Sequence, residues 1–382
     1  MRSVCQILPA LDSGGVERGT LEIANALQKA GMPNLVVSSG GKLVAELEKA
    51  GVKHVTLPVH SKNPFVMFLT ALKLRKVFKD ENVGVVHVRS RAPAWTTKIA
   101  LKPFKNIAFL ATYHGTYGIK PAWIKKPYNR VMLSGDLVIA VSKHIANHIK
   151  ENYGVPDEKI RLVCRGAETD LFDPAKVSEA ERRALAEKWG IDTSKTILML
   201  PGRLTRIKGH HLVMDALAQM RHKDDVQCLF VGGDQGKTEY TDELKAEIEK
   251  RGLTGKVLLT GGCSQMPAAY MLADIVISAT TKPEAFGRTI PEAQLMGALV
   301  VGANYGGAAE TIEHNVTGMH FKPSDAADLA EKIDAMIDLP DAEKQKMREA
   351  AAAFVRKNFT IQLLCDKTLG IYQELLTKYE AK

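Results

Sequence analysis

The chain lacks the cysteine patterns that mark disulfide-rich and zinc-binding proteins. Its five cysteines are scattered over 382 residues, with no Cys-x-x-Cys pair and no cysteine–histidine cluster at metal-ligand spacing. This distribution argues against a disulfide framework and a structural zinc site, and it favours a reducing compartment. No low-complexity tract is present, and a composition of 45% hydrophobic and 25% charged residues is typical of a globular protein.

Long apolar runs are also missing. No window holds the run of about 18 apolar residues that a membrane span needs. The apolar start of the chain is short and ends at Asp12, so we expect no signal peptide. These absences predict a soluble, cytoplasmic protein. The net charge of +9 suits an anionic partner, either a small phosphorylated ligand or an anionic surface, and does not choose between them.

Short β-rich runs alternate with helical patterns along the whole chain, which is typical of parallel α/β structure. In the first half, helices are expected at residues 17–30 and 65–79, among others. Strands are expected there at residues 3–8, 35–38, 54–57, 84–88, 108–112, 137–141 and 159–163. A second series of strands is expected at residues 196–200, 227–231, 257–259, 275–278 and 299–302.

The two series predict two doubly wound α/β domains, because a single core rarely extends over 382 residues. We place the first domain at residues 1–165 and the second at residues 166–358. Residues 359–382 form a closing amphipathic helix that packs back on the first domain. Ligands of open α/β sheets bind beyond the carboxyl ends of the strands, so we expect the site in the cleft between the domains.

Two loops of the first domain follow strands and are candidates for ligand binding. Gly14 and Gly15 let the backbone approach a phosphate and open a helix, although a plain tight turn also explains them. His114 follows a later strand and suits a hydrogen bond to a sugar hydroxyl, although lone histidines are often structural. Neither loop carries the Gly-x-Gly-x-x-Gly pattern of dinucleotide-binding proteins.

Cations gather after the first strand of the second domain. Arg203 and Lys208 follow Gly202 and precede a helix, and an arginine fork with a lysine point charge suits a diphosphate. A solvated basic turn is the simpler alternative. The loops after the next two strands are candidate walls for a nucleotide base, and their candidate residues are Gly233, Ser264 and Met266.

Two carboxylates, Glu284 and Glu292, flank the start of a predicted helix. Pro291 fits the first turn, where a missing N–H costs nothing, so Glu292 lies in that turn at the positive end of the helix dipole. Such a terminus attracts anions, and carboxylates beside it accept hydrogen bonds from hydroxyls. The combination suits a ligand that is part phosphate and part polyol, such as a sugar nucleotide.

Taken together, the motifs resemble glycosyltransferase family 4, the retaining nucleotide-sugar glycosyltransferases with two Rossmann-like domains, known as the GT-B fold. The resemblance covers nearly the whole chain and rests on the order and spacing of the motifs. One departure is the sequence Arg-Gly-Ala-Glu at 165–168, where many members have Asn-Gly-Val-Asp. The motifs are Gly-Gly-Val-Glu at 14–17, His-Gly-Thr at 114–116, Ala-Val-Ser at 140–142, Gly-Arg at 202–203, Lys-Gly at 208–209, and Glu284 with Glu292.

The resemblance implies roles for the candidate residues. The first domain would bind the acceptor and the second the nucleotide sugar. Arg203 and Lys208 would hold the diphosphate and stabilise it as the leaving group. Glu292 would accept from the ribose hydroxyls, while Glu284 and His114 would meet the donor sugar. The remaining donor-binding residues, which act largely through the main chain, would be Gly14, Gly15, Gly202, Gly233, Ser264, Met266, Phe286, Gly287, Arg288 and Thr289.

The expected reaction is hexose transfer with retention of anomeric configuration, without a metal or other cofactor. No Asp-x-Asp triplet occurs in the chain, which agrees with a site where cations of the protein take the part of a divalent metal. Neither carboxylate is a convincing nucleophile, so the resemblance implies same-face attack assisted by the leaving phosphate. The donor would be a sugar nucleotide such as a UDP- or GDP-hexose.

Basic residues stand beside apolar ones at residues 71–79 and 117–128. These stretches suit an anionic membrane surface, such as the inner face of the plasma membrane, although a solvated helix face and loop explain them almost equally well. Similar sequences suggest a glycolipid or saccharide acceptor of the cell envelope, with the lipopolysaccharide core as the first choice. No nucleic-acid partner is expected.

Other functions stay open at this point. A sugar-nucleotide epimerase, or a transferase to a small soluble acceptor, would use the same architecture. A nicotinamide-dependent oxidoreductase is disfavoured by the missing glycine pattern. A non-catalytic binding protein is disfavoured by the complete set of Arg203, Lys208, Glu284 and Glu292.

Overall fold

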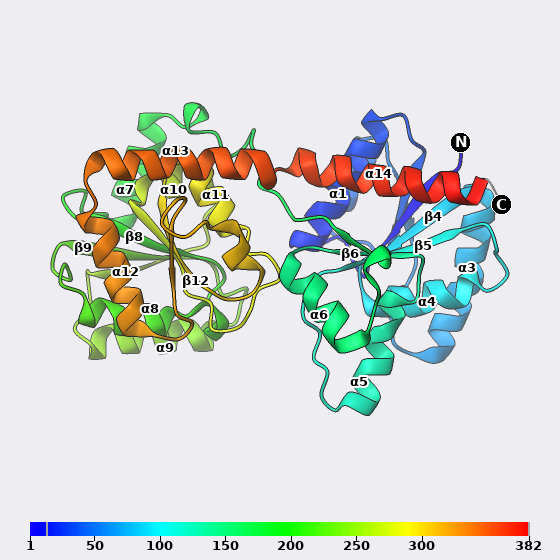
Figure 1. The fold of residues 1–382 in the computed structure, drawn as a ribbon, viewed down its shortest axis with the longest axis horizontal. Helices are drawn as coiled ribbons and strands as arrows, with labels where there is room; N and C mark the ends of the chain where they lie inside the picture. Colours follow the sequence, from blue (N-terminus) through cyan, green and yellow to red (C-terminus); the bar gives the residue numbers. More distant parts are fainter. Residues whose placement is uncertain (13, 381–382) are drawn as a thin grey trace. The chain divides into compact units, whose positions relative to one another are not determined.

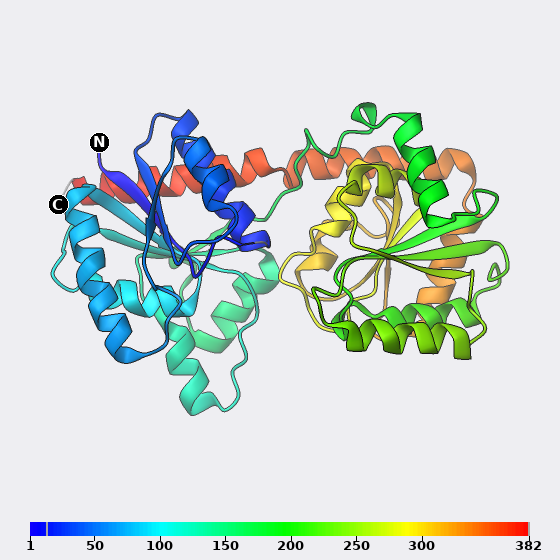
Figure 2. The same ribbon diagram turned by 180° about the vertical axis from the view of Figure 1, so that it is seen from behind.

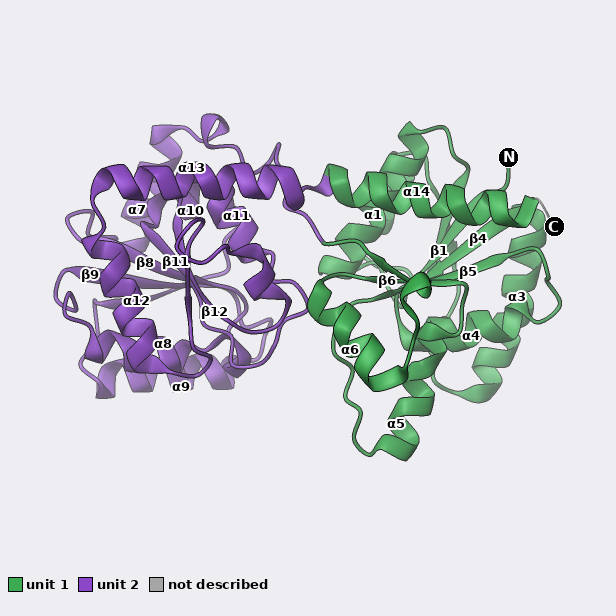
Figure 3. Ribbon diagram, in the orientation of Figure 1, with its two compact units in different colours: residues 1–164, 362–382 green, residues 165–361 purple. Residues whose placement is uncertain are grey.

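The computed structural model describes residues 1–12 and 14–380 of the chain. It divides into two compact units, which are coloured separately in Figure 3. Unit 1 comprises Met1–Cys164 and Gln362–Lys382, and unit 2 comprises Arg165–Ile361. The chain therefore leaves unit 1 once and returns to it with its last helix (Figure 1).

Unit 1 is built on a seven-stranded sheet in the order β3-β2-β1-β4-β5-β6-β7, with every pair of neighbours parallel. The central strands are buried at every position, which is why they lack the regular alternation of apolar and polar residues that a half-exposed strand shows. The strands are β1 (Ser3–Ile7), β2 (Asn34–Ser38), β3 (Lys53–Thr56), β4 (Val83–Val88), β5 (Ala108–Tyr113), β6 (Leu137–Ala140) and β7 (Ile160–Leu162).

Local signals in the sequence set the helix starts of unit 1. Asn63 accepts hydrogen bonds from the amides of Phe65 and Val66 before a proline in the first turn, and Ser142 accepts from the amide of Ile145. The helices are α1 (Gly15–Lys29), α2 (Val44–Lys49), α3 (Pro64–Asp80), α4 (Arg91–Leu101), α5 (Ala122–Asn129), α6 (Lys143–Tyr153) and α14 (Ile361–Glu380), with short 3₁₀ turns η1 (Arg130–Leu133) and η2 (Asp157–Lys159).

Helix α14 is fixed to unit 1 by buried polar contacts as well as by its apolar face. The hydroxyl of Tyr372, which is fully buried, lies 2.6 Å from Nδ1 of His87 on β4. Nearer the surface, Arg161 donates to Glu374 at 2.7 Å. The helix thus belongs to unit 1 although it is the last element of the chain, as the view from behind also shows (Figure 2).

Unit 2 repeats the architecture with a six-stranded parallel sheet in the order β10-β9-β8-β11-β12-β13. Its strands are β8 (Thr196–Pro201), β9 (Val226–Val231), β10 (Val257–Gly261), β11 (Ile275–Ser278), β12 (Leu299–Ala303) and β13 (Met319–Phe321). Its helices are α7 (Glu179–Trp189), α8 (His210–Gln219), α9 (Thr238–Lys250), α10 (Met266–Leu272), α11 (Thr289–Leu295), α12 (Ala326–Asp338) and α13 (Asp341–Asn358), with 3₁₀ turns η3 (Pro174–Lys176), η4 (Arg206–Lys208) and η5 (Gly307–Thr311).

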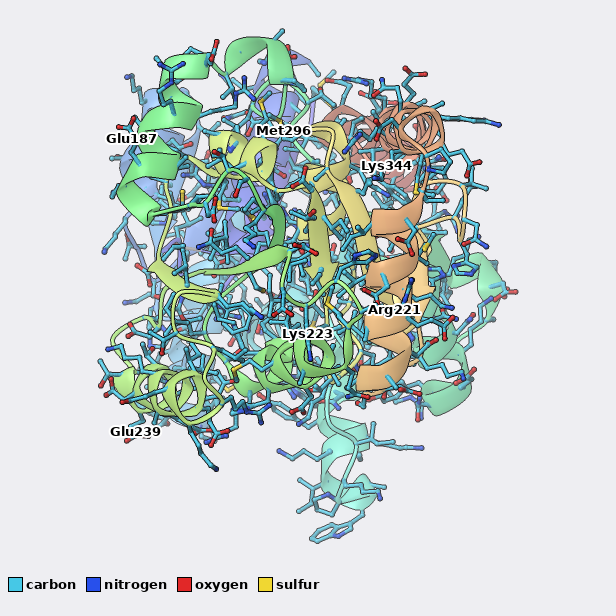
Figure 4. All side chains as sticks on the ribbon, turned by 90° about the vertical axis from the view of Figure 1, so that its left-hand side faces the viewer. Glu187, Arg221, Lys223, Glu239, Met296 and Lys344 are labelled. Atoms are coloured by element: carbon cyan, nitrogen blue, oxygen red, sulfur yellow. The ribbon has the colours of Figure 1, made fainter. Side chains whose placement is uncertain are left out.

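Polar contacts join the helices of unit 2 where the apolar core ends. The backbone amide of Arg221, just beyond α8, donates to Asp334 of α12 at 2.8 Å. The side chains of Arg221 and His222 both reach Asp338, one turn further along α12. Figure 4 shows Arg221 beside this helix. The contacts fix the end of α8 against α12.

The structure confirms the predicted fold of two α/β domains with parallel sheets. All twelve predicted strands are present, most of them within one or two residues of the predicted bounds. Strand β13 was not predicted, because its three residues form no recognisable apolar run. Among the described residues, no helix combines the length and apolarity needed to cross a bilayer.

Candidate functional site

In unit 2, most of the residues predicted to bind a ligand lie in the loops after β8, β9, β10 and β11. The carboxyl ends of parallel strands lie at one edge of a sheet, so these loops are neighbours. Glycines let them approach closely. A Cβ on Gly232 would overlap the carbonyl oxygen of Gly202, so the loops after β8 and β9 lie closer together than a side chain would allow.

Gly202 makes room for the side chain of Lys208. Its φ of +140° lies in the region that favours glycine, and a Cβ there would lie 2.9 Å from Cε of Lys208. Lys208 ends the turn η4, and Gly209 follows with a φ of +81° as the residue before α8. The two glycines therefore let the chain double back so that Lys208 lies over the end of β8.

Lys208 forms an ion pair with Glu284. The distance from Nζ to Oε1 is 2.5 Å, and the two side chains are only 22% and 20% exposed. The backbone of Glu284 is held in turn, because the amide of Gly307 donates to its carbonyl at 2.8 Å. The structure thus brings together a cation and a carboxylate that lie 76 positions apart.

The two arginines of the loop after β8 have partners other than Glu284. Arg203 is exposed, and its Nη1 donates to Oε1 of Gln235 in the loop after β9 at 3.3 Å. Arg206 is paired with Glu243 of α9 and lies over the ring of Tyr240 at 5.1 Å. Of the two cations predicted to bind a diphosphate, Lys208 lies over the end of β8 and Arg203 reaches the loop after β9.

Glu292 is buried inside a small polar cluster. It lies in the first turn of α11, as predicted, but only 8% of it is exposed. The hydroxyl of Tyr270 donates to Oε2 at 3.0 Å, and Nη2 of Arg288 lies 3.1 Å from Oε1. Burial raises the pKa of the Glu292 carboxyl, while the Arg288 guanidinium and the Tyr270 hydroxyl oppose that rise.

The loop before α11 is shaped by packing. Phe286 is buried and its ring lies 5.5 Å from that of Phe359, so only its backbone remains for a ligand. Gly287 has a φ of +84°, and a Cβ there would lie 2.7 Å from the Cβ of Ala308. Thr289 is the first residue of α11. At Phe286 and Gly287 the loop therefore offers a ligand only main-chain contacts.

The predicted base wall lies at the start of α10. Ser264 is exposed in the loop after β10, and Met266 is the first residue of the helix and half-buried. The same helix carries Tyr270 one turn later. Tyr270 could not be recognised as a site residue from the sequence, because the apolar run around it predicts only a core position.

Three predicted residues belong to unit 1. Gly14, with a φ of +144°, precedes the first residue of α1, Gly15. Ser13, beside them in the motif, lies outside the described residues. His114 directly follows β5 and is half-buried. The next aromatic residue, Tyr117, lies under the guanidinium of Arg91 at 4.4 Å.

In the parts of the chain that the structure describes, no group of three or more His, Cys, Asp or Glu side chains could hold a metal ion.

A buried histidine lies beside the loop that carries Arg203 and Lys208. His210 follows Gly209, and its Nδ1 lies 3.3 Å from the hydroxyl of Tyr240. Burial lowers the pKa of His210 to about 4, so it is neutral at pH 7 and adds no charge.

Comparisons with known proteins cover both units. Residues 13–171 match the family model described as Glycosyltransferase Family 4, and residues 181–354 match the one described as Glycosyl transferases group 1. A curated relative, D-inositol 3-phosphate glycosyltransferase 1 of Catenulispora acidiphila, is 27% identical over 303 residues, which span 77% of this chain and 70% of the relative.

Solved structures agree. A crystal structure of a glycosyltransferase from Rickettsia africae ESF-5 is 41% identical, with a TM-score of 0.91 over 98% of each chain. The Anabaena protein HepE, crystallised with UDP, is 23% identical and shares the fold, with a TM-score of 0.84 over 98% of this chain and 100% of its own. The chain belongs to glycosyltransferase family 4 and has the GT-B fold.

Proposed function

We propose that this protein is a retaining, metal-independent hexosyltransferase that uses a nucleotide-diphosphate hexose, such as a UDP- or GDP-hexose. The observation that carries the proposal is the half-buried Lys208 held over the end of β8. Breaking a sugar–phosphate bond builds negative charge on the diphosphate. A fixed cation aimed at that charge lowers the barrier.

The other residues of unit 2 fit the same donor. Arg203 lies on the same loop after β8 and supplies a second cation for the diphosphate. Glu292 accepts from the ribose hydroxyls, and Glu284 accepts from hydroxyls of the hexose. Since neither carboxylate is a nucleophile here, the acceptor oxygen attacks the anomeric carbon on the face that the phosphate leaves. The acceptor proton passes to the departing phosphate oxygen as the carbon–oxygen bond breaks.

A screen of nucleotide sugars tests the donor. We expect UDP- or GDP-hexoses to raise the thermal unfolding temperature and to be slowly hydrolysed, with the same rates in EDTA. If no nucleotide sugar binds at millimolar concentration, the proposal is wrong. If EDTA abolishes the reaction, its metal-independent part is wrong.

For the acceptor, we propose a cell-envelope glycolipid, with the lipopolysaccharide core first to be tested, and peripheral binding at the inner face of the plasma membrane. Unit 1 supports this with exposed apolar side chains among lysines. On α3, Phe65 is 70% exposed, and Phe68, Leu69 and Leu72 are exposed too. On α5, Trp123 is 79% exposed and stands beside Lys125 and Lys126. Aromatic residues next to cations favour an anionic membrane surface.

Vesicle flotation tests the membrane proposal. We expect binding to phosphatidylglycerol vesicles at low salt and not to phosphatidylcholine vesicles. Replacing Phe65 and Phe68 with serine should release the protein. The matched control is Leu171→Ser, which removes an exposed leucine from unit 2 and should have no effect. Wild-type protein that stays unbound at low salt would rule out the proposal.

A small soluble acceptor is the second candidate, because the curated relative named above is called a D-inositol 3-phosphate glycosyltransferase. Product analysis separates the candidates. A transferase to a soluble acceptor yields a glycosylated small molecule without vesicles. An epimerase interconverts the donor sugar with no acceptor present.

A further inference from the structure

The hydroxyl of Tyr270 contacts Glu292, and this contact is not needed to fill space in the core. The side chain is fully buried on α10, and its ring lies 5.9 Å from that of Phe172. A phenylalanine would fill the same space. The hydroxyl instead lies 3.0 Å from Oε2 of Glu292. The polar contact, rather than the ring, therefore distinguishes tyrosine at this position.

The second oxygen of Glu292 has its own donor. Nε and Nη2 of Arg288 lie 3.2 Å and 3.1 Å from Oε1. One donor thus comes from α10 and the other from the residue before α11, so the plane of the carboxylate is fixed from two elements. Each carboxylate oxygen has about two lone pairs. Both nitrogens of Arg288 lie at Oε1, whereas Oε2 has the Tyr270 hydroxyl alone, so the remaining acceptor capacity is on Oε2.

Helix α10 links this carboxylate to the base wall. It begins at Met266, directly after the loop that carries Ser264, and Tyr270 follows one turn later. A shift of the base loop would therefore move the hydroxyl that holds Glu292. This step rests on the function proposed above. If Glu292 binds the ribose, the position of its carboxylate depends on α10, the same helix whose start contacts the base.

We propose that Tyr270 and the side chain of Arg288 are positioning residues that hold Glu292 so that it selects ribonucleotide over 2′-deoxyribonucleotide donors. A site built to bind a hydroxyl rejects an analogue that lacks it, because the buried polar group is then left unpaired. Without the two donors, Glu292 turns freely and its preference for the 2′-hydroxyl declines.

The test is the ratio of affinities for UDP and 2′-deoxy-UDP, measured by calorimetry and repeated with GDP and 2′-deoxy-GDP. We expect wild-type protein to prefer the ribonucleotide by about 10-fold or more, because a hydrogen bond to a charged group is lost in the analogue. In Tyr270→Phe the ratio should fall below about 3-fold, mainly through weaker binding of the ribonucleotide. A purely structural role would weaken both nucleotides equally and keep the ratio.

The control is Tyr372→Phe, which removes an equally buried tyrosine hydroxyl from unit 1 and should leave the ratio unchanged. If Tyr270→Phe does not fold, Arg288→Gln removes the other donor and is expected to narrow the same ratio. An unchanged ratio in the folded variant overturns the inference while the proposed function stands. Failure of wild-type protein to bind either ribonucleotide refutes the proposed function itself.

Discussion

Replacing Lys208 with methionine tests the assignment on which the proposed function depends. Methionine keeps the apolar stem over Gly202 and removes the charge. Removing one group that stabilises developing charge in a transition state costs about 10²–10³-fold in kcat, or about 2.7–4 kcal/mol. We expect a loss of this size in Lys208→Met.

The ion pair with Glu284 complicates the interpretation, because loss of the charge also leaves a carboxylate without its cation. Both side chains are about one-fifth exposed. The pair therefore lies between an exposed pair, worth about 0–1 kcal/mol, and a buried one, whose breaking costs about 3–5 kcal/mol. A fall of about 1–3 kcal/mol in the free energy of unfolding is expected for Lys208→Met.

A double-mutant cycle with Glu284→Gln separates the two effects. If Lys208 binds the diphosphate, Lys208→Met costs about 10²–10³-fold in either background, whereas its cost in unfolding free energy nearly vanishes beside glutamine. The assay is initial-rate kinetics on the donor found by the screen, with chemical unfolding in parallel. Residual activity within about 10-fold of wild type, or a loss that disappears beside Glu284→Gln, would refute the assignment. Arg206→Gln is the matched control, since Arg206 is held by Glu243, and should retain activity.

Two further predictions concern the backbone at Gly202 and the buried imidazole of His87. Gly202→Ala should lower activity about 10-fold or more, because the added Cβ displaces Lys208. The control Gly236→Ala, also at positive φ but with open space around its Cβ, should keep its activity. Equal losses in the two variants would mean that backbone strain alone lowers activity. Burial holds the pKa of His87 well below 6.5, so the unfolded chain binds more protons than the folded one, and stability should fall as pH drops below about 6.5. Replacing His87 with Gln should flatten the dependence of the unfolding free energy on pH between 5 and 6.5, and an unchanged slope would contradict the assignment.

The fold was readable from the sequence because parallel strands covered on both faces leave a plain signal. The strand at Val83–Val88 is buried at every position and carries valine at four of its six positions, so its composition predicts a strand. Strand β13, by contrast, has only three residues and pairs at the edge of the sheet with β12. A run so short carries too little composition to be distinguished from a loop.

The sequence predicted where the candidate residues lie in the fold, but not the partners of their side chains. Lys208 and Glu284 each follow a strand, and topology alone puts strand ends together. Their ion pair depends on the path of the loop through Gly202 and Gly209, which residue types do not specify. Tyr270 was missed because helical periodicity explains its burial fully, and only the direction of the hydroxyl reveals a polar contact.

Glu284 and Glu292 share one feature that the sequence could not show: each forms an ion pair with a basic side chain of unit 2. Glu284 is paired with Lys208 and Glu292 with Arg288, so these charges are compensated within unit 2. A ligand that draws Lys208 to a phosphate must also satisfy Glu284, since an unpaired, half-buried carboxylate is costly. Free phosphate or a nucleoside diphosphate supplies only the anion. A sugar nucleotide supplies the anion and the hydroxyls together, so the pairing of Lys208 with Glu284 favours the complete donor over its fragments.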